Sequence, residues 1–244
     1  MAKASSASNI RPLSAQRPLV NPKMDEHEIV DRIYAAVMEQ QLPPNTKLGE
    51  ASLCESLGVG RMKARRALLL LANQGIVVLH SHRGAFVACP DRGESKDVFG
   101  ARLAIEPNIV RQVVVIAKEK DFEDLEALIN LEQQAQERGD RRQSIKLSGE
   151  FHVQLAAATG NAVLRKMVRE LVARTSLIIG MFGSPGATNC PEHEHRDILE
   201  ALRERDDDRA ADLTRQHLEH IEASLDLSTG KSKQLDLNAI LGGT

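Results

Sequence analysis

Three histidines in the second half of the chain have the chemistry of metal ligands. His152, His195 and His217 each fall on a separate predicted helix, and Phe151 and Leu218 place two of them beside an apolar core position. Helices packed in a bundle can direct such side chains into one cavity, where three imidazoles leave an open position on a zinc, nickel or manganese ion. A single histidine on an apolar face is more often a core residue, so a metal site requires all three to converge.

Four cations are concentrated in the first two turns of another predicted helix, at Arg61, Lys63, Arg65 and Arg66. The apolar residues of this helix recur every three or four positions, so they can pack on a core while the cations face outward. A bidentate arginine on guanine is the commonest specific contact with DNA, and further cations bind phosphate. The helix is therefore predicted to bind DNA, and the alternative is a solvated basic surface with no partner.

A hairpin with a basic tip follows this helix. Residues 76–79 and 85–88 have the pattern of strands, and the residues between them include Arg83 and Gly84. These two could enter a minor groove, because a cation gains from its concentrated negative potential and glycine permits close approach of the backbone. For the neighbouring His80 and His82, an ordinary turn is nearly as good an interpretation.

The residues before the basic helix supply a scaffold for it. A helix is expected over residues 25–40 and a second over 51–57, and Gly58-Val59-Gly60 forms the turn before the basic helix. Three helices followed by a hairpin make a winged helix-turn-helix domain, predicted here over residues 24–89. Residues 1–23, rich in Ser, Ala, Pro and Asn, are predicted to form a disordered tail.

Length and composition fit two domains. The chain has 244 residues, of which 27% are charged, 42% are hydrophobic and only 2% are aromatic. This balance favours a mostly helical globular protein. The net charge of −2 excludes a polycation, so nucleic acid must be bound by a local cluster of cations.

The cysteines and the lengths of the apolar segments indicate the cellular compartment of the protein. Cys54, Cys89 and Cys190 are odd in number and lack C-x-x-C spacing, so neither a disulfide framework nor a cysteine zinc site is indicated. No apolar run is long enough to span a membrane, and the first residues lack the apolar core of a signal peptide. We expect a reduced, cytoplasmic protein that makes no membrane contact.

Beyond a linker predicted at residues 90–96, the chain has the pattern of an all-helical bundle over residues 97–226. Helical periodicity recurs in six segments, at residues 98–117, 122–136, 144–159, 163–182, 192–205 and 208–225. Residues 163–182 are apolar at nearly every position, which predicts the central buried helix of the bundle. Residues 227–244 are expected to be a loose tail.

The order of these motifs resembles a known family. L-x-E, GVGR-x-x-x-R-x-AL-x-x-L, GIV and HRGAFV are similar to the N-terminal domain of GntR-type bacterial transcriptional regulators. EFHVQLAAATGN and EHRDILEALRERDDDRAADLTRQHLEHI resemble the all-helical FCD effector domain of the FadR subgroup. The resemblance covers most of residues 25–225. It makes Arg61 and Arg65 the better candidates for reading bases, and it assigns the three histidines to the positions of the family's metal ligands.

Three positions depart from the family pattern. Gly60 and Arg66 stand where Ser and Glu are usual, which removes a hydroxyl and makes the helix more basic. Ser148 stands one turn before His152, where many members have an aspartate as a fourth metal ligand. A neutral hydroxyl supplies no charge, so either the metal is held more weakly or water or effector fills the position.

The resemblance also implies a small organic acid as effector. A buried arginine could pair with its carboxylate, and Arg102 and Arg174 are the candidates, with Ser148 beside the metal. For Arg102, a structural pair with Glu106 one turn away is an equally good interpretation.

These residues together predict a ligand-responsive transcriptional regulator, a repressor by the commoner arrangement, that binds a palindromic operator as a homodimer. A metal-dependent enzyme built on the three histidines is the alternative, although the sequence contains neither H-E-x-x-H nor a nucleophile with its base. A module whose helical domain only dimerises is a third interpretation.

Overall fold

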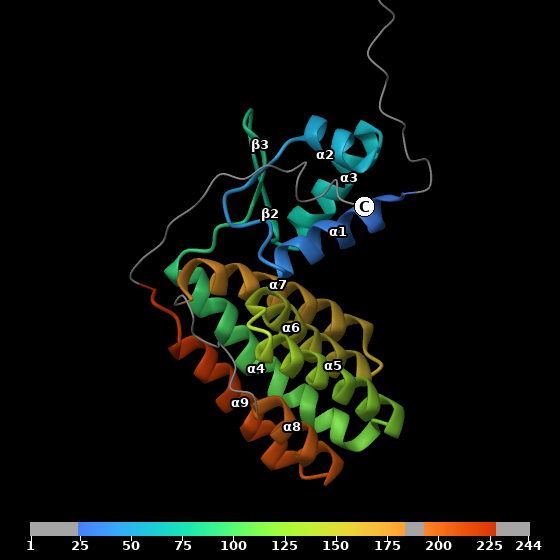
Figure 1. Ribbon diagram of the computed structural model, residues 1–244, viewed down its shortest axis with the longest axis vertical. Coiled ribbons are helices and arrows are strands. Elements are labelled where there is room, and N and C mark those ends of the chain that lie inside the picture. The colour runs from blue at the N-terminus through green and yellow to red at the C-terminus, as the bar shows by residue number, and fades with distance from the viewer. Residues whose placement is uncertain (1–23, 184–192, 228–244) are drawn as a thin grey trace, which may run out of the picture.

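The computed structural model describes residues 24–183 and 193–227. Its ribbon has two lobes joined end to end, a small one with helices and a sheet and a larger helical bundle (Figure 1). The mostly helical, two-part fold predicted from the sequence is confirmed over these residues. The predicted tail 1–23 and nearly all of the predicted tail 227–244 lie outside the described residues.

The first helix, α1 (Glu26–Met38), begins at a capping box. The Asp25 side chain accepts hydrogen bonds from the backbone N–H groups of His27 and Glu28, at 2.8 and 2.9 Å. In return the Glu28 carboxylate accepts one from the Asp25 N–H at 2.7 Å. These bonds satisfy donors that the first turn of a helix leaves unpaired, so the start of α1 is fixed locally.

The predicted helix-turn-helix is formed by α2 (Glu50–Leu57) and α3 (Arg61–Asn73). Between them Gly58 adopts a left-handed conformation with φ of 61°, which glycine enters without the steric cost of a Cβ. The predicted apolar side of α3 is buried, comprising Ala64, Ala67, Leu68 and Leu71. Burial of this side leaves the opposite side of α3 facing outward.

The predicted hairpin consists of β2 (Val77–His80) and β3 (Gly84–Val87), which pair antiparallel. A strand not predicted from the sequence, β1 (Lys47–Leu48), pairs with the other edge of β3 to give the order β1-β3-β2. Two residues are too few to show an alternating pattern. The three strands form the wing of a winged helix domain.

The linker predicted at residues 90–96 is wrong for most of its length. Helix α4 (Arg92–Ile116) begins inside it, and the Asp91 side chain caps the helix by accepting a hydrogen bond from the Glu94 N–H at 2.8 Å. Pro90 and Gly93 suggest a break in the sequence, yet one glycine in the first turn of a capped helix costs only about 1 kcal/mol. The chain therefore passes from one lobe to the other within the few residues between β3 and α4.

The larger lobe packs five further helices around α4 within the described residues. These are α5 (Glu119–Glu137), α6 (Arg141–Ala158), α7 (Ala162–Phe182), α8 (Glu194–Arg203) and α9 (Asp207–Ala223). Helix α4 packs on α6, α7 and α9, and α5 packs on α6 and α8. Over residues 24–183 and 193–227, the structure contains no helix with the length and apolarity needed to cross a membrane.

Helix α7 is not central in the bundle, although its apolar sequence predicts that position. It packs on α4 and α6 and also contacts α1 of the smaller lobe (Figure 1). Arg169 of α7 donates to Asp31 of α1 at 2.7 Å, and its guanidinium carbon lies 3.8 Å from the centre of the Tyr34 ring. Contacts with two domains explain a helix that is apolar on more than one side.

Phe99 provides a test of the bundle's packing. It is wholly buried on α4, in a cluster with Ile178 and Phe182. Phe99→Ala should lower the free energy of unfolding by about 3 to 5 kcal/mol, because it removes buried apolar surface and leaves a cavity. Val115→Ala on the same helix, where the side chain is 79% exposed, should change it by less than about 0.5 kcal/mol. Urea denaturation followed by circular dichroism measures both, and equal losses would contradict this packing.

Candidate functional site

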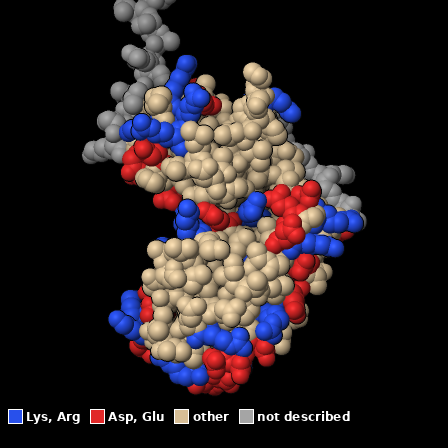
Figure 2. Space-filling model, turned by 180° about the vertical axis from the view of Figure 1, so that it is seen from behind, with Lys and Arg blue, Asp and Glu red and all other residues tan. Residues whose placement is uncertain are grey.

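Three of the four predicted cations on helix α3 are exposed to solvent, Arg61, Arg65 and Arg66. Lys63 instead turns back, and its Nζ donates to the carbonyl oxygen of Met24 at 2.7 Å. Arg66 lies 3.6 Å from the carboxylate of Glu26 at the start of α1, although its side chain remains 61% exposed. Figure 2 shows Lys and Arg side chains gathered at the outer end of this lobe. Both arginines favoured by the family resemblance, Arg61 and Arg65, thus face outward.

Two apolar residues that the sequence analysis missed are also exposed on α3. Met62 is 64% exposed and Leu69 is 48% exposed. Met62 lies three residues before Arg65, and Leu69 lies four residues after it, so helical spacing sets them beside this arginine. The same spacing could have identified them in the sequence. Exposed apolar side chains on a reading helix can contact the methyl group of thymine.

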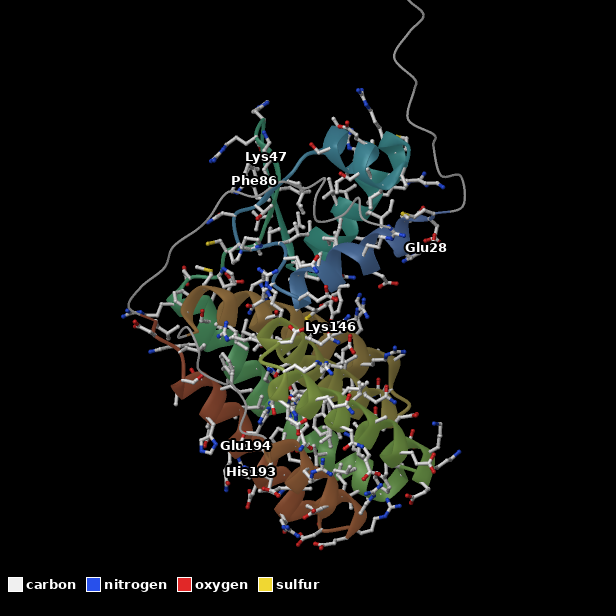
Figure 3. All side chains as sticks on the ribbon, viewed as in Figure 1. Glu28, Lys47, Phe86, Lys146, His193 and Glu194 are labelled. Atoms are coloured by element: carbon white, nitrogen blue, oxygen red, sulfur yellow. The ribbon has the colours of Figure 1, made fainter. Side chains whose placement is uncertain are left out.

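The wing has its predicted cation and one more. Gly84 has φ of 96°, a conformation that favours glycine, and the guanidinium of Arg83 lies 5.6 Å from the centre of the Phe86 ring. Lys47 on β1 is paired with Phe86 across the sheet (Figure 3), so a further exposed cation lies beside the hairpin. No sequence signal identifies Lys47, because it belongs to a two-residue strand.

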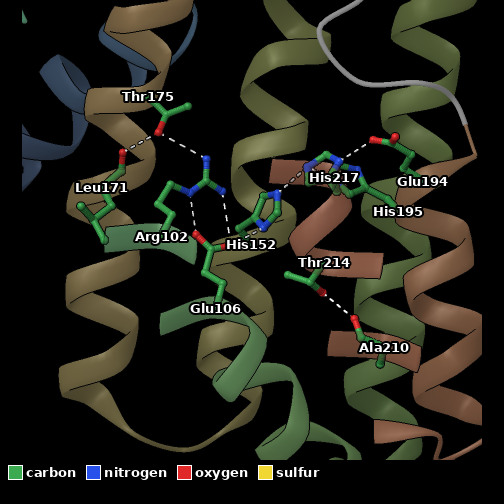
Figure 4. Close-up of polar contacts among 10 residues, drawn as sticks. All are labelled: Arg102, Glu106, His152, Leu171, Thr175, Glu194, His195, Ala210, Thr214 and His217. Carbon is green, nitrogen blue, oxygen red and sulfur yellow. Dashed lines mark hydrogen bonds and ion pairs between the residues drawn. The ribbon is translucent and has the colours of Figure 1, made fainter. Parts of the chain in front are cut away.

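The structure brings the three predicted metal ligands together. His152 of α6, His195 of α8 and His217 of α9 form a buried group, each no more than 2% exposed, which we name the histidine cluster. His217 Nε2 lies 3.0 Å from His152 Nε2 and 3.2 Å from His195 Nε2 (Figure 4). The neighbouring His193 and His220 lie outside the cluster and are exposed, as predicted.

A carboxylate stands behind each imidazole of the histidine cluster. Glu132 pairs with Nδ1 of the α8 histidine at 2.7 Å, and Glu194 with Nδ1 of the α9 histidine at 2.8 Å. Glu106 lies 2.7 Å from Nδ1 of the α6 histidine, in contact but without hydrogen-bond geometry. Metal-bound histidines typically have such partners, which fix the tautomer and aim the other nitrogen at the ion. None of the three carboxylates was predicted to contact a histidine, although Glu106 was considered as a partner of Arg102, and only Glu194, next to a candidate ligand, carried a local signal.

Burial keeps two of the imidazoles neutral. It lowers the pKa of His152 to about 4 and the pKa of His217 well below its usual range, and at His217 the neighbouring imidazoles add to the shift. Burial alone would raise the pKa of Glu106, but the adjacent Arg102 and His152 outweigh it and hold that pKa at about 2. Neutral imidazoles backed by an ionised carboxylate are in the state that binds metal ions.

The donor set of the histidine cluster fits a divalent ion. If the Nδ1 hydrogens point at carboxylates, the Nε2 atoms present lone pairs to one another, and a cation between them stabilises that arrangement. The ligand atoms all lie within 4.8 Å of one another. A tetrahedral ion with bonds of about 2.1 Å separates its ligands by about 3.4 Å, close to the two contacts observed. Three imidazoles leave a fourth position open.

A small cavity adjoins the cluster at His152. Its volume is about 30 Å³, room for one or two water molecules. Two of the three predicted effector residues, Ser148 and Arg102, line it. Arg102 donates to Glu106 at 2.5 Å and to Thr175 at 3.3 Å, so it forms the structural pair expected as its alternative while it also lines the cavity.

Arg174, the third predicted effector residue, does not line this cavity, and that prediction is corrected. Its guanidinium donates to Glu94 at 2.7 Å and lies against Gly75, where a Cβ would come within 2.9 Å of Arg174 Nε. The apolar sequence around Arg174 suggests an interior position. Its carboxylate partner comes instead from the first turn of α4, at the junction of the two lobes.

The fold and these sites define a class of protein, in which a winged helix-turn-helix DNA-binding domain is followed by a helical domain that encloses a histidine cluster and a cavity. Residues 26–87 match the family described as bacterial regulatory proteins, gntR family, and residues 97–220 match the FCD domain. The chain belongs to the GntR family of bacterial transcriptional regulators and carries an FCD domain.

Sequence relatives cover most of the chain. The HTH-type transcriptional repressor RspR of Escherichia coli is 24% identical over 208 residues, which span 84% of this chain and 91% of RspR. The HTH-type transcriptional repressor NanR of Cronobacter sakazakii is 25% identical over 242 residues, which span 89% of this chain and 91% of NanR. These relatives are regulators, so the alternative of a metal-dependent enzyme is set aside and the chain is a transcriptional regulator.

Solved structures share the fold. Escherichia coli McbR/YncC superimposes with a TM-score of 0.72 at 19% identity, covering 80% of this chain and 93% of that one. A putative GntR regulator from Rhodococcus superimposes with a TM-score of 0.70, also at 19% identity, covering 81% and 95%. The agreement over both lobes supports the fold described here, in which a winged helix domain is followed by a helical bundle.

Acid should destabilise the protein once any metal is removed with EDTA. The unfolded chain protonates histidine near a pKa of 6.5, whereas the pKa of His152 in the fold is about 4. The unfolded state therefore binds more protons between these values, and stability declines as the pH falls through this window. Thermal unfolding from about pH 7.5 to 4.5 measures the effect. The decline should be shallower in His152→Asn and unchanged in His27→Gln, whose exposed side chain lies on α1 in the other lobe. A midpoint temperature of unfolding that stays constant over this pH range would contradict a buried, neutral His152.

Proposed function

We propose that the chain is a ligand-responsive repressor that binds a palindromic operator as a homodimer. The observation that carries the proposal is the outward display of Arg61 and Arg65 from a helix whose other side is packed, beside a wing with its own cations. Such a helix fits the major groove, where arginine pairs with guanine. The names of RspR and NanR favour repression over activation. Bacterial DNA lies in the cytoplasm, so we expect the protein there.

A second copy of the chain is proposed to pack along α4 and α7. An open groove of about 440 Å³ lies there, and its lining includes Ala101, Ile105, Met167 and Leu171. Val163, on the same helix as Met167, is 66% exposed. Small and apolar residues allow two helices to approach closely and bury surface together. Two-fold symmetry would present two copies of α3 to successive major grooves, which is why a palindromic operator is expected.

We propose that the histidine cluster holds a zinc, nickel or manganese ion and that a small organic acid is the effector. The ion would supply positive charge and an open position suited to a carboxylate. Ser148 and Arg102, in the wall of the adjoining cavity, would orient the acid through hydrogen bonds. A volume of about 30 Å³ holds one or two water molecules, so the cavity must enlarge to admit an organic acid.

DNA binding is tested by arginine substitutions on α3. Arg61→Ala and Arg65→Ala should each weaken binding to a duplex selected from a random library by about tenfold or more, because a bidentate guanine contact contributes about 1 to 3 kcal/mol. Lys120→Ala is the matched control, since this exposed lysine lies on α5 in the helical lobe, and it should change affinity by less than about threefold. Fluorescence anisotropy measures all three. Wild-type affinity in both arginine variants would contradict the proposal that this side of α3 binds DNA.

Metal content tests the histidine cluster. Elemental analysis after dialysis against zinc should find about one ion per chain in the wild type and none in His195→Ala. Glu132→Gln should lower affinity about 10- to 100-fold by loosening that histidine, whereas Ser148→Asp should raise affinity by adding a charged ligand. His27→Ala is the control, because its exposed side chain lies on α1 in the other lobe. A wild type without stoichiometric metal would rule the site out.

A further inference from the structure

The small cavity beside the histidine cluster is lined by both domains. Its wall includes Met38, the last residue of α1 in the DNA-binding domain, together with Gly149 and Ser176 of the helical domain. Met38 is only 1% exposed, so its side chain lies wholly within the junction of the two domains. A ligand in this cavity would therefore touch the DNA-binding domain directly.

Helices α1 and α6 approach closely at Gly149. A Cβ at Gly149 would lie 2.5 Å from Met38 Cε and 2.7 Å from Val172 Cγ1. Carbon atoms in contact are normally about 3.5 to 4 Å apart, so only a glycine permits this approach. Since the cavity holds one or two water molecules, an organic acid must displace part of the wall. Methionine, unbranched and with three rotatable bonds, is the wall residue best able to move.

The end of α1 is tied to the same wall. The Ser176 hydroxyl donates to the carbonyl oxygens of the last two residues of α1, at 3.3 and 3.2 Å, and so ties α7 to the C-terminal end of α1. Gln40 Nε2 donates back to the Ser176 carbonyl at 3.3 Å. Lys146 forms an ion pair with Glu39 at 2.8 Å, where the bundle meets α1 (Figure 3). Displacing Met38 therefore acts on a held helix end and not on a loose side chain.

Movement of α1 would reach the reading helix. Helix α1 packs against α3, and Lys63 of α3 is bonded to Met24 just before α1 begins. Close-packed elements move together, because the interior contains no empty volume to absorb a shift. The outward arginines of α3 are thus one helix-to-helix contact away from the cavity wall.

We propose that Met38 is the residue through which the cavity controls DNA binding. A ligand that fills the cavity displaces Met38, shifts α1 against α3 and weakens operator binding. This inference rests on the proposed function, since it presumes an operator and a cavity ligand. It depends on the volume that the ligand occupies, so a methyl group added to the wall can stand in for the unidentified effector.

Gly149→Ala supplies that methyl group. Binding to the duplex selected by the wild type should weaken about tenfold, a size usual for coupling between two sites. Adding Met38→Ala to the same chain should restore affinity to within about threefold of wild type, because the new methyl no longer pushes α1. The overlap with Val172 remains in both variants, so both should lose thermal stability. Gly180→Ala is the matched control, because its Cβ would lie 3.5 Å from Gln40 in ordinary contact, and it should bind like the wild type.

Three results would overturn the inference. Gly149→Ala could bind the duplex as tightly as the wild type, the double variant could bind as weakly as Gly149→Ala, or the Gly180→Ala control could weaken binding equally. Should Gly149→Ala fail to fold, Ser176→Ala tests the same link by releasing the α1 carbonyls, and it should weaken binding about threefold. Unchanged affinity in Ser176→Ala would then overturn the inference. A wild type that selects no duplex at all would instead overturn the proposed function, which separates the two failures.

Discussion

The structure depends on the close approach of α1 to α6 and α7. Gly149 permits this approach, and Met38 and Val172 occupy the space that a larger side chain would need. Helix α1 contributes to the core of the winged domain and also closes the cavity of the helical domain, so each domain completes the other. In a close-packed interior a ligand cannot be added without moving a neighbour. The DNA-binding domain is such a neighbour, because Met38 of α1 lines the cavity.

Buried charge organises the opposite wall of the cavity. Glu106 contacts both Arg102 and His152, and Arg102 in turn donates to Thr175, next to the serine that holds α1. An unpaired ion in this interior would be very costly, so Arg102 and Glu106 each require the other as a partner. Burial keeps the imidazole of His152 neutral by lowering its pKa, although the contact with Glu106 acts in the opposite direction. The candidate metal site, the cavity and the end of α1 therefore belong to one continuous set of contacts.

Local patterns predicted much of this protein, and long-range contacts account for most of what they missed. The apolar spacing on α3, the hairpin with Arg83 and the three histidines could be read from neighbouring residues. The carboxylate partners could not, because Glu132 reaches its histidine across 63 positions of sequence. Arg174 was assigned to the wrong place for the same reason, since its partner Glu94 lies on another helix. The start of α4 was missed because the Asp91 cap outweighs a proline and a glycine that suggest a linker.

Coupling between the cavity and the operator must act in both directions, because linkage of two binding equilibria is reciprocal. Hydrogen exchange of the wild-type protein, measured by mass spectrometry with and without its selected duplex, therefore tests the central claim without an effector. The account predicts slower exchange in α3 and the wing, and in addition altered exchange at the last turn of α1 and at residues 144–152 of α6. Changes confined to α3 and the wing would contradict it.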